Sequence, residues 1–169
     1  MREPLFILSP PRSFSSLISS MIGQHPELHA FPELQIFSDE TIGDMMEKNQ
    51  RRFNRLSSAG SIRSIAEVHE HQQTDESCAR AWLWLQKRSA WSPSDFFDYL
   101  RKKIDPQIAV EKTPVNTWKA SRLETIIRTY PNAKFLHLSR SVNGNSSSLK
   151  EFIKDQDKLL GRQETDQLT

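Results

Sequence analysis

Three short runs of consecutive apolar residues interrupt a chain whose apolar positions otherwise recur mostly at helical spacing. The runs cover Leu5–Ser9, Ile108–Glu111 and Lys134–Ser139, and each is followed by a helical pattern. Apolar runs of this length are typical of strands buried on both faces, and strands that alternate with helices are typical of βαβ units. The pattern therefore predicts an α/β protein with three layers, α/β/α, built around a parallel sheet.

The long segment 37–105 contains no convincing strand and predicts a helical insert between the first two of these strands. One helix is expected over Asp75–Ala90. Another is expected to begin at Ser92, which can cap it, with Pro93 at the first helical position. A last helix is expected over Ser147–Leu160, where apolar side chains recur on one side.

Length and composition indicate one domain with a single hydrophobic core. The chain has 169 residues, and we expect the domain to cover residues 1–160 and a polar tail to follow at 161–169. With 26% charged residues, a mean hydropathy of −0.62 and no apolar run of bilayer length, no membrane span is expected. The net charge of +2 does not indicate nucleic-acid binding.

The sequence contains a single cysteine, Cys78, so no internal disulfide can form. No secretory signal precedes the first predicted strand, and both observations favour a cytoplasmic location. We expect Cys78 to pack in the core, and His137, inside the third apolar run, to be a core histidine. His69 and His71 lack the i, i+4 spacing of a helical zinc pair, so no metal site is expected.

The first apolar run ends in a polar turn that carries one cation and several hydroxyl groups. Two prolines break the strand, Arg12 follows, and then come Ser13, Ser15 and Ser16, before apolar residues at helical spacing. The first N–H groups of a helix have no partners inside the helix, and the helix dipole favours negative charge there. The turn therefore predicts a site for an anion such as phosphate or sulfate.

A P-loop kinase would place its phosphates at such a turn, but the sequence lacks the Gly-x-x-x-x-Gly-Lys-Ser/Thr pattern of that class. The segment Pro11–Ser16 resembles instead the 5′-phosphosulfate loop of the sulfotransferase family, whose usual form is Pro-Lys/Arg-Ser-Gly-Thr-Thr. Arg12 matches the cation of that loop, and Phe14 stands at its glycine position. The resemblance implies a P-loop-like fold.

Segments near the first helix resemble the same family. Gln24–Leu28 is similar to the His-Pro-x-Leu motif of bacterial members. Phe31–Leu34 places Glu33 where several branches carry an acidic catalytic residue. The resemblance implies that Glu33 is the general base, and His69 and His71 stay as alternative bases.

Two later segments extend the resemblance. Glu111–Pro114 is similar to the Glu-Lys-Thr/Ser-Pro segment of carbohydrate-type members, which implies that Lys112 contacts the sulfuryl oxygens. Tyr130–Arg140 resembles the strand that leads to the 3′-phosphate site. The family has an arginine there and a serine eight positions later, which gives Arg140 and Ser148.

The resemblance implies transfer of a sulfuryl group from 3′-phosphoadenosine-5′-phosphosulfate (PAPS) to a hydroxyl of a small-molecule, lipid or carbohydrate acceptor, without a metal. Arg12 is expected to stabilise charge on the departing phosphate, because a fixed cation there acts as that charge develops. The nucleotide is expected to contact Arg12, Ser13, Phe14, Ser15, Ser16, Arg140 and Ser148.

Members of the family are longer than this chain. Their C-terminal part supplies another strand and a basic, glycine-containing loop that closes over the nucleotide, and neither is recognisable after Leu149. We therefore expect the chain to be truncated relative to the family. A non-catalytic nucleotide-binding or interaction module that kept the fold is an alternative to an active enzyme.

Overall fold

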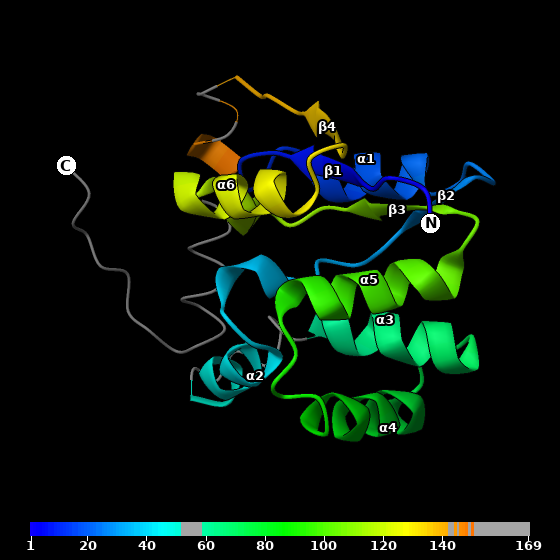
Figure 1. Ribbon diagram of the computed structural model, residues 1–169. Helices are drawn as coiled ribbons and strands as arrows, with labels where there is room; N and C mark the ends of the chain where they lie inside the picture. Colours follow the sequence, from blue (N-terminus) through cyan, green and yellow to red (C-terminus); the bar gives the residue numbers. More distant parts are fainter. Residues whose placement is uncertain (52–58, 142–143, 145, 149, 151–169) are drawn as a thin grey trace.

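The structure is a computed structural model that describes the chain except for residues 52–58, 142–143, 145, 149 and 151–169. The described residues form one parallel sheet in the order β2-β3-β1-β4 (Figure 1). The three predicted strands and the α/β architecture are confirmed. The strands are β1 (Leu5–Leu8), β2 (Leu28–Ala30), β3 (Ile108–Glu111) and β4 (Lys134–His137).

The strand β2 is an addition that the sequence pattern does not indicate, because its three residues are half-buried and form no apolar run. Backbone bonds to β3 hold both of its ends. Phe31 N–H donates to the Val110 carbonyl at 3.0 Å, and Ile108 N–H donates to the Glu27 carbonyl at 2.8 Å. The helical insert therefore lies between β2 and β3, and α1 (Ser15–Ile22) joins β1 to β2.

Three helices of the insert lie one below another beneath the sheet, with α5 nearest to the strands, then α3, then α4 (Figure 1). The helix α6 connects β3 to β4 after a short 3₁₀ helix, η2. The bounds of these elements are η1 (Ile36–Ser38), α2 (Ile42–Arg51), α3 (Ala59–Glu70), α4 (Asp75–Gln86), α5 (Pro93–Ile104), η2 (Pro114–Thr117) and α6 (Ala120–Thr129).

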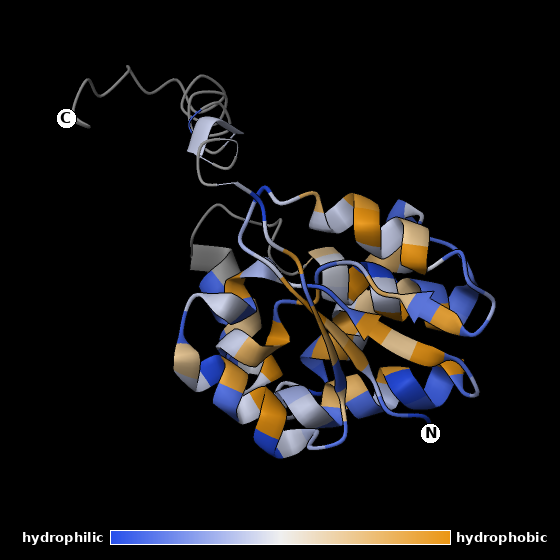
Figure 2. Cartoon of the chain, turned by 90° about the horizontal axis from the view of Figure 1, so that it is seen from above, coloured by the Kyte–Doolittle hydropathy of each residue, from blue (hydrophilic) through white to orange (hydrophobic). Residues whose placement is uncertain are grey.

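The hydrophobic core is centred on β1. The ring of Phe6 lies 5.6 Å from that of Phe97 on α5 and 5.8 Å from that of Tyr130. Ile7 points to the opposite face of the strand, because strand residues alternate, and it is also fully buried. Figure 2 shows the apolar strands at the centre, surrounded by helices of mixed polarity. Both faces of β1 are thus covered, as three layers require.

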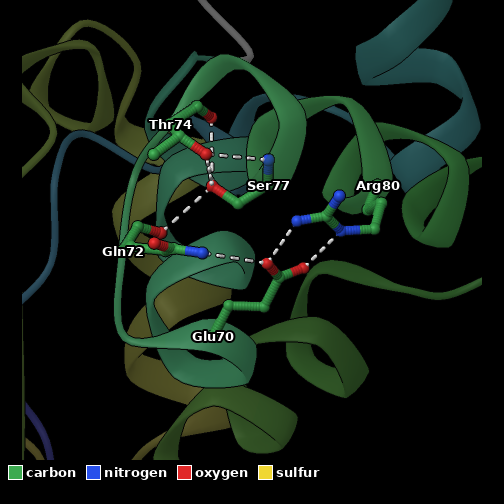
Figure 3. Close-up of polar contacts among 5 residues, drawn as sticks. All are labelled: Glu70, Gln72, Thr74, Ser77 and Arg80. Atoms are coloured by element: carbon green, nitrogen blue, oxygen red, sulfur yellow. Dashed lines mark hydrogen bonds and ion pairs between the residues drawn. The ribbon is translucent and has the colours of Figure 1, made fainter.

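Polar contacts fix the turn between α3 and α4 (Figure 3). Thr74 caps α4 by accepting a bond from the Ser77 N–H at 3.2 Å, and the Ser77 hydroxyl donates to the Gln72 carbonyl at the same distance. Arg80 donates to both carboxylate oxygens of Glu70, at 2.7 and 2.5 Å. These bonds lower the pKa of Glu70 below its usual value. The turn therefore holds α4 against α3.

Several predictions for the helical region are confirmed. The helix α4 covers most of Asp75–Ala90, and α5 begins after a capping box formed by Ser92 and Asp95. Cys78 packs against the core as expected. Most of the predicted helix at Ser147–Leu160 lies outside the described residues.

The prediction of a buried His137 is wrong. β4 lies at the edge of the sheet formed by the described residues, and Lys134, Phe135 and His137 are all exposed. An edge strand is covered less than a central one, so its apolar run does not imply burial. The predicted polar tail at 161–169 also lies outside the described residues.

Candidate functional site

The carboxyl ends of the four parallel strands meet at one edge of the sheet, and each leads into a predicted site residue. β1 leads into Arg12 and Ser13, β2 into Glu33, β3 into Lys112 and β4 into Arg140. Open α/β sheets bind their ligands at this edge. The topology therefore gathers residues that are more than a hundred positions apart in the sequence.

The turn between β1 and α1 has the backbone of an anion site. Arg12 and Phe14 are in the left-handed region, with φ of 63° and 57°. Turns that contain left-handed residues commonly point successive N–H groups into one concavity that binds anions. The helix α1 follows with no side-chain cap and no acidic residue in its first turn. Its N-terminal N–H groups therefore face no competing carboxylate from that turn.

A buried hydroxyl adds to the donors of this turn. Ser13 is 7% exposed, and its hydroxyl has no hydrogen-bond partner among the described residues. Ser9, directly after β1, is also buried, and its hydroxyl likewise has no hydrogen-bond partner among the described residues. Ser9 was not among the predicted site residues. Buried hydroxyls are costly to leave unpaired, and a phosphate or sulfate oxygen would satisfy them. The turn is therefore suited to bind an anion such as phosphate or sulfate.

Phe14 adopts the conformation that glycine normally supplies. Its left-handed φ explains why a loop of this shape favours glycine, since a side chain there is strained. The Phe14 ring is 61% exposed, and the Arg140 guanidinium lies 4.5 Å from its centroid. The ring therefore points out of the turn and forms a cation–π contact with Arg140.

Contacts to the β1–α1 turn bring Arg12, Arg140 and Ser148 together. Arg140 Nη1 donates to the Arg12 carbonyl at 2.8 Å, and Arg12 Nε donates to Ser148 Oγ at 3.1 Å. The two arginines thus lie next to each other, beyond the carboxyl ends of β1 and β4. Both cations therefore belong to the surroundings of the β1–α1 turn, where they add positive charge.

Lys112 connects three elements of the site. Its side chain is buried, and Nζ donates to Ser16 Oγ on α1 at 3.0 Å and to Glu33 Oε1 at 2.5 Å. Glu33 is more open, with 38% of its side chain exposed. Lys112 is therefore a buried cation that links α1, next to the proposed anion turn, to the Glu33 carboxylate.

A buried carboxyl behind Lys112 was not among the predicted site residues. Glu111 is 1% exposed, and it accepts hydrogen bonds from the Thr113 hydroxyl and from Asn116 Nδ2, the latter at 3.0 Å. Burial raises the pKa of Glu111 to about 7, although Thr113 and Lys112 act in the opposite direction. The sequence signal was a carboxylate inside an apolar strand run.

The structure separates the two alternative bases from this cluster. Glu33 lies against the start of α3, where a Cβ on Gly60 would come within 1.9 Å of the Glu33 carbonyl oxygen. His69 is at the other end of α3, roughly 14 Å further along the helix axis. There it bonds to the Tyr99 hydroxyl at 2.7 Å. His71 follows the helix and is exposed, so the geometry favours Glu33 over both histidines.

The close approach at Gly60 gives a first prediction. Gly60→Ala is expected to lower the free energy of unfolding by about 1–3 kcal/mol, because the backbone of Glu33 must move to admit the methyl group. Denaturant unfolding followed by circular dichroism measures this change. An unchanged midpoint would contradict the close packing of α3 on Glu33.

The part of the chain that the structure describes contains neither a candidate metal site nor a candidate membrane-spanning helix. No grouping of three or more His, Cys, Asp or Glu side chains able to hold a metal ion is present there. No helix there combines the length and the apolar character that crossing a bilayer requires.

Comparison with known proteins agrees with this geometry. The model described as the sulfotransferase family matches residues 4–169. The sulfotransferase domain from the Synechococcus PCC 7002 olefin synthase has 26% identity and a TM-score of 0.76, over 92% of this chain and 56% of that chain. The sulfotransferase domain from the curacin biosynthetic pathway has 25% identity and a TM-score of 0.74, over 98% of this chain and 56% of that chain. No curated protein matches significantly.

This chain therefore spans little more than half the length of these solved domains. The family match nevertheless covers almost all of its residues, and its parallel sheet is that of the solved domains. The chain belongs to the sulfotransferase family.

Proposed function

We propose that this site binds PAPS and transfers its sulfuryl group to a hydroxyl acceptor. The acceptor oxygen attacks sulfur, the bond from sulfur to the bridging phosphate oxygen breaks, and adenosine 3′,5′-bisphosphate leaves. The proton of the acceptor hydroxyl passes to the Glu33 carboxylate. By analogy with phosphoryl transfer, positioning and electrostatics supply most of the rate, and no protein nucleophile is needed.

The nucleotide contacts are proposed on both sides of the β1–α1 turn. Ser13, Ser15, Ser16 and the backbone around Phe14 would hold the 5′-phosphosulfate. Arg140 and Ser148 would bind the 3′-phosphate, since a guanidinium matches phosphate geometry in a bidentate manner.

The observation that carries this proposal is the position of Lys112. Its ammonium group joins Ser16, in the proposed phosphosulfate loop, to Glu33, the proposed base. A cation between these two residues would contact the sulfuryl group as it passes from the loop towards the acceptor. Arg12 would stabilise the departing phosphate from the same loop.

The acceptor class is proposed as a small-molecule, lipid or carbohydrate hydroxyl, and the location as the cytoplasm. Because the chain spans 56% of the solved relatives' length, complete catalysis by these residues alone is part of the proposal. A non-catalytic nucleotide-binding module is the second candidate.

Titration with adenosine 3′,5′-bisphosphate tests the nucleotide site. Arg140→Ala is expected to weaken binding roughly 10–100-fold, the usual range for a lost hydrogen bond to a charged group. Arg128→Ala, at the exposed last turn of α6, is the matched control and should leave the affinity unchanged. Isothermal titration calorimetry measures all three proteins.

Absence of nucleotide binding by the folded wild-type chain would overturn the proposal. Binding without transfer of labelled sulfate from PAPS, in a screen of alcohols, phenols and sugars, would instead support the non-catalytic module.

A further inference from the structure

Glu111 is the one buried carboxyl at the carboxyl edge of the described sheet that the proposed reaction does not use. It lies at the end of β3, directly before Lys112, and it is fully enclosed by protein. Its two oxygens have separate partners, the Thr113 hydroxyl on Oε1 and Asn116 Nδ2 on Oε2. A buried carboxyl with two ordered donors is held in one orientation.

Thr113 extends this arrangement to the segment that carries Glu33. While its hydroxyl donates to Glu111, the same oxygen accepts a bond from the Gln35 N–H at 3.2 Å. Gln35 has a φ of 55°, in the left-handed region that favours glycine. A non-glycine residue persists in this conformation only where its surroundings hold it. The bond from Gln35 to Thr113 is one such restraint, two residues after Glu33.

We propose that Glu111 is a positioning residue: it orients the Thr113 hydroxyl, and Thr113 in turn holds the Gln35 turn that presents Glu33 to Lys112. The proposal deepens the sulfuryl-transfer function stated above and rests on it for its effect on rate. Glu111 itself touches no reacting atom. The connection runs from the Glu111 carboxyl through the Thr113 hydroxyl to the backbone N–H of Gln35, and so links β3 to the segment after β2.

The charges around Glu111 are consistent with this role. Lys112 and Glu33 are the charged groups that act on it, the first favouring its ionised form and the second opposing it. In the ionised form both oxygens accept, which matches the two donors Thr113 and Asn116. Glutamine at this position would offer one acceptor oxygen and one amide, so one of the two donors would lose its partner.

Nuclear magnetic resonance on the full chain tests the connection without any activity. In Glu111→Gln and in Thr113→Val, the amide resonance of Gln35 and the carboxyl carbon resonance of Glu33 are expected to shift. In the wild type, the Glu33 resonance should also respond to the titration of Glu111 near neutral pH, and this response should be absent from Glu111→Gln. Thr113→Ser keeps the hydroxyl and should restore the wild-type spectrum. Glu124→Gln, on the exposed face of α6, is the control.

Turnover gives the second readout. Glu111→Gln and Thr113→Val are expected to lower kcat for sulfuryl transfer roughly 10–100-fold, because small displacements of catalytic groups have effects of this size. The affinity for adenosine 3′,5′-bisphosphate should change by less than about twofold, since the proposed nucleotide contacts lie in the β1–α1 turn, at the start of α1 and beyond β4.

The outcomes separate the two proposals. If the wild type does not bind the nucleotide, the sulfuryl-transfer function fails, while the spectra still test the link from Glu111 to Glu33. If the Gln35 and Glu33 resonances are unchanged in both variants, the positioning role is overturned even where transfer is active. Should Glu111→Gln fail to fold, Thr113→Val is compared with Thr113→Ser. Equal Gln35 and Glu33 resonances in these two variants would overturn the proposal, because only the serine keeps the hydroxyl that bonds to Glu111 and Gln35.

Discussion

Lys112→Met is expected to reduce sulfuryl transfer roughly 10²–10³-fold while the chain remains folded. Lys112 bonds to Ser16 and Glu33, so the substitution removes the cation proposed to act on the sulfuryl oxygens and leaves the carboxylate of Glu33 without it. Loss of one preorganised donor at a site of developing charge usually has an effect of this size. Methionine has a similar length and an apolar stem, so it fills most of the same buried space.

The measurement is release of adenosine 3′,5′-bisphosphate from PAPS with an acceptor found by screening. Lys102→Met, on an exposed position of α5, is the matched control and should keep wild-type turnover. A fall in affinity for the bisphosphate with kcat unchanged would mean that Lys112 only binds the nucleotide. Wild-type turnover in Lys112→Met would mean that Lys112 takes no part in sulfuryl transfer.

Much of the site could be predicted because its residues follow strands in short local motifs. Arg12, Lys112 and Arg140 each come within a few positions of a strand's carboxyl end, and a parallel sheet brings such positions together. The strands β1, β3 and β4 could be predicted because each coincides with a short apolar run. The contacts among these side chains agree with that placement, whereas the chemical roles assigned to them stay predictions.

The features that the sequence did not reveal depend on partners far along the chain. The strand β2 is three residues long, and its pairing with β3 defines it more than its own composition does. The exposure of His137 follows from the place of β4 at the sheet edge, which strand order decides. The bond from Gln35 to Thr113 spans 78 positions, so no local pattern could indicate it.

Phe14 illustrates a local departure that the structure explains. The sequence places an aromatic residue where the family has glycine. The left-handed backbone is kept despite the side chain, and the exposed ring lies against Arg140. The cost of the left-handed conformation is on the order of 1 kcal/mol, which a cation–π contact can offset.

The stability of the protein is expected to fall as the pH rises through neutrality because of Glu111. Its pKa is raised from the usual 4.5 to about 7 by burial, so over this interval the folded protein holds a proton that the unfolded chain has released. The contribution of Glu111 to the free energy of unfolding is therefore fully present below about pH 4.5, and it is lost as the pH rises through 7. The full effect corresponds to about 3 kcal/mol.

Other carboxylates act in the opposite direction, since the pKa values of Glu70 and Asp95 are lowered and their contribution is lost on acidification. Comparison with Glu111→Gln, which does not titrate, isolates the Glu111 contribution. The free energy of unfolding of the wild type relative to this variant should fall by roughly 2–3 kcal/mol between about pH 5 and pH 8. Urea unfolding at several pH values measures it. A constant difference would mean that Glu111 titrates alike in both states, and the enclosure of its carboxyl behind Lys112 would then be wrong.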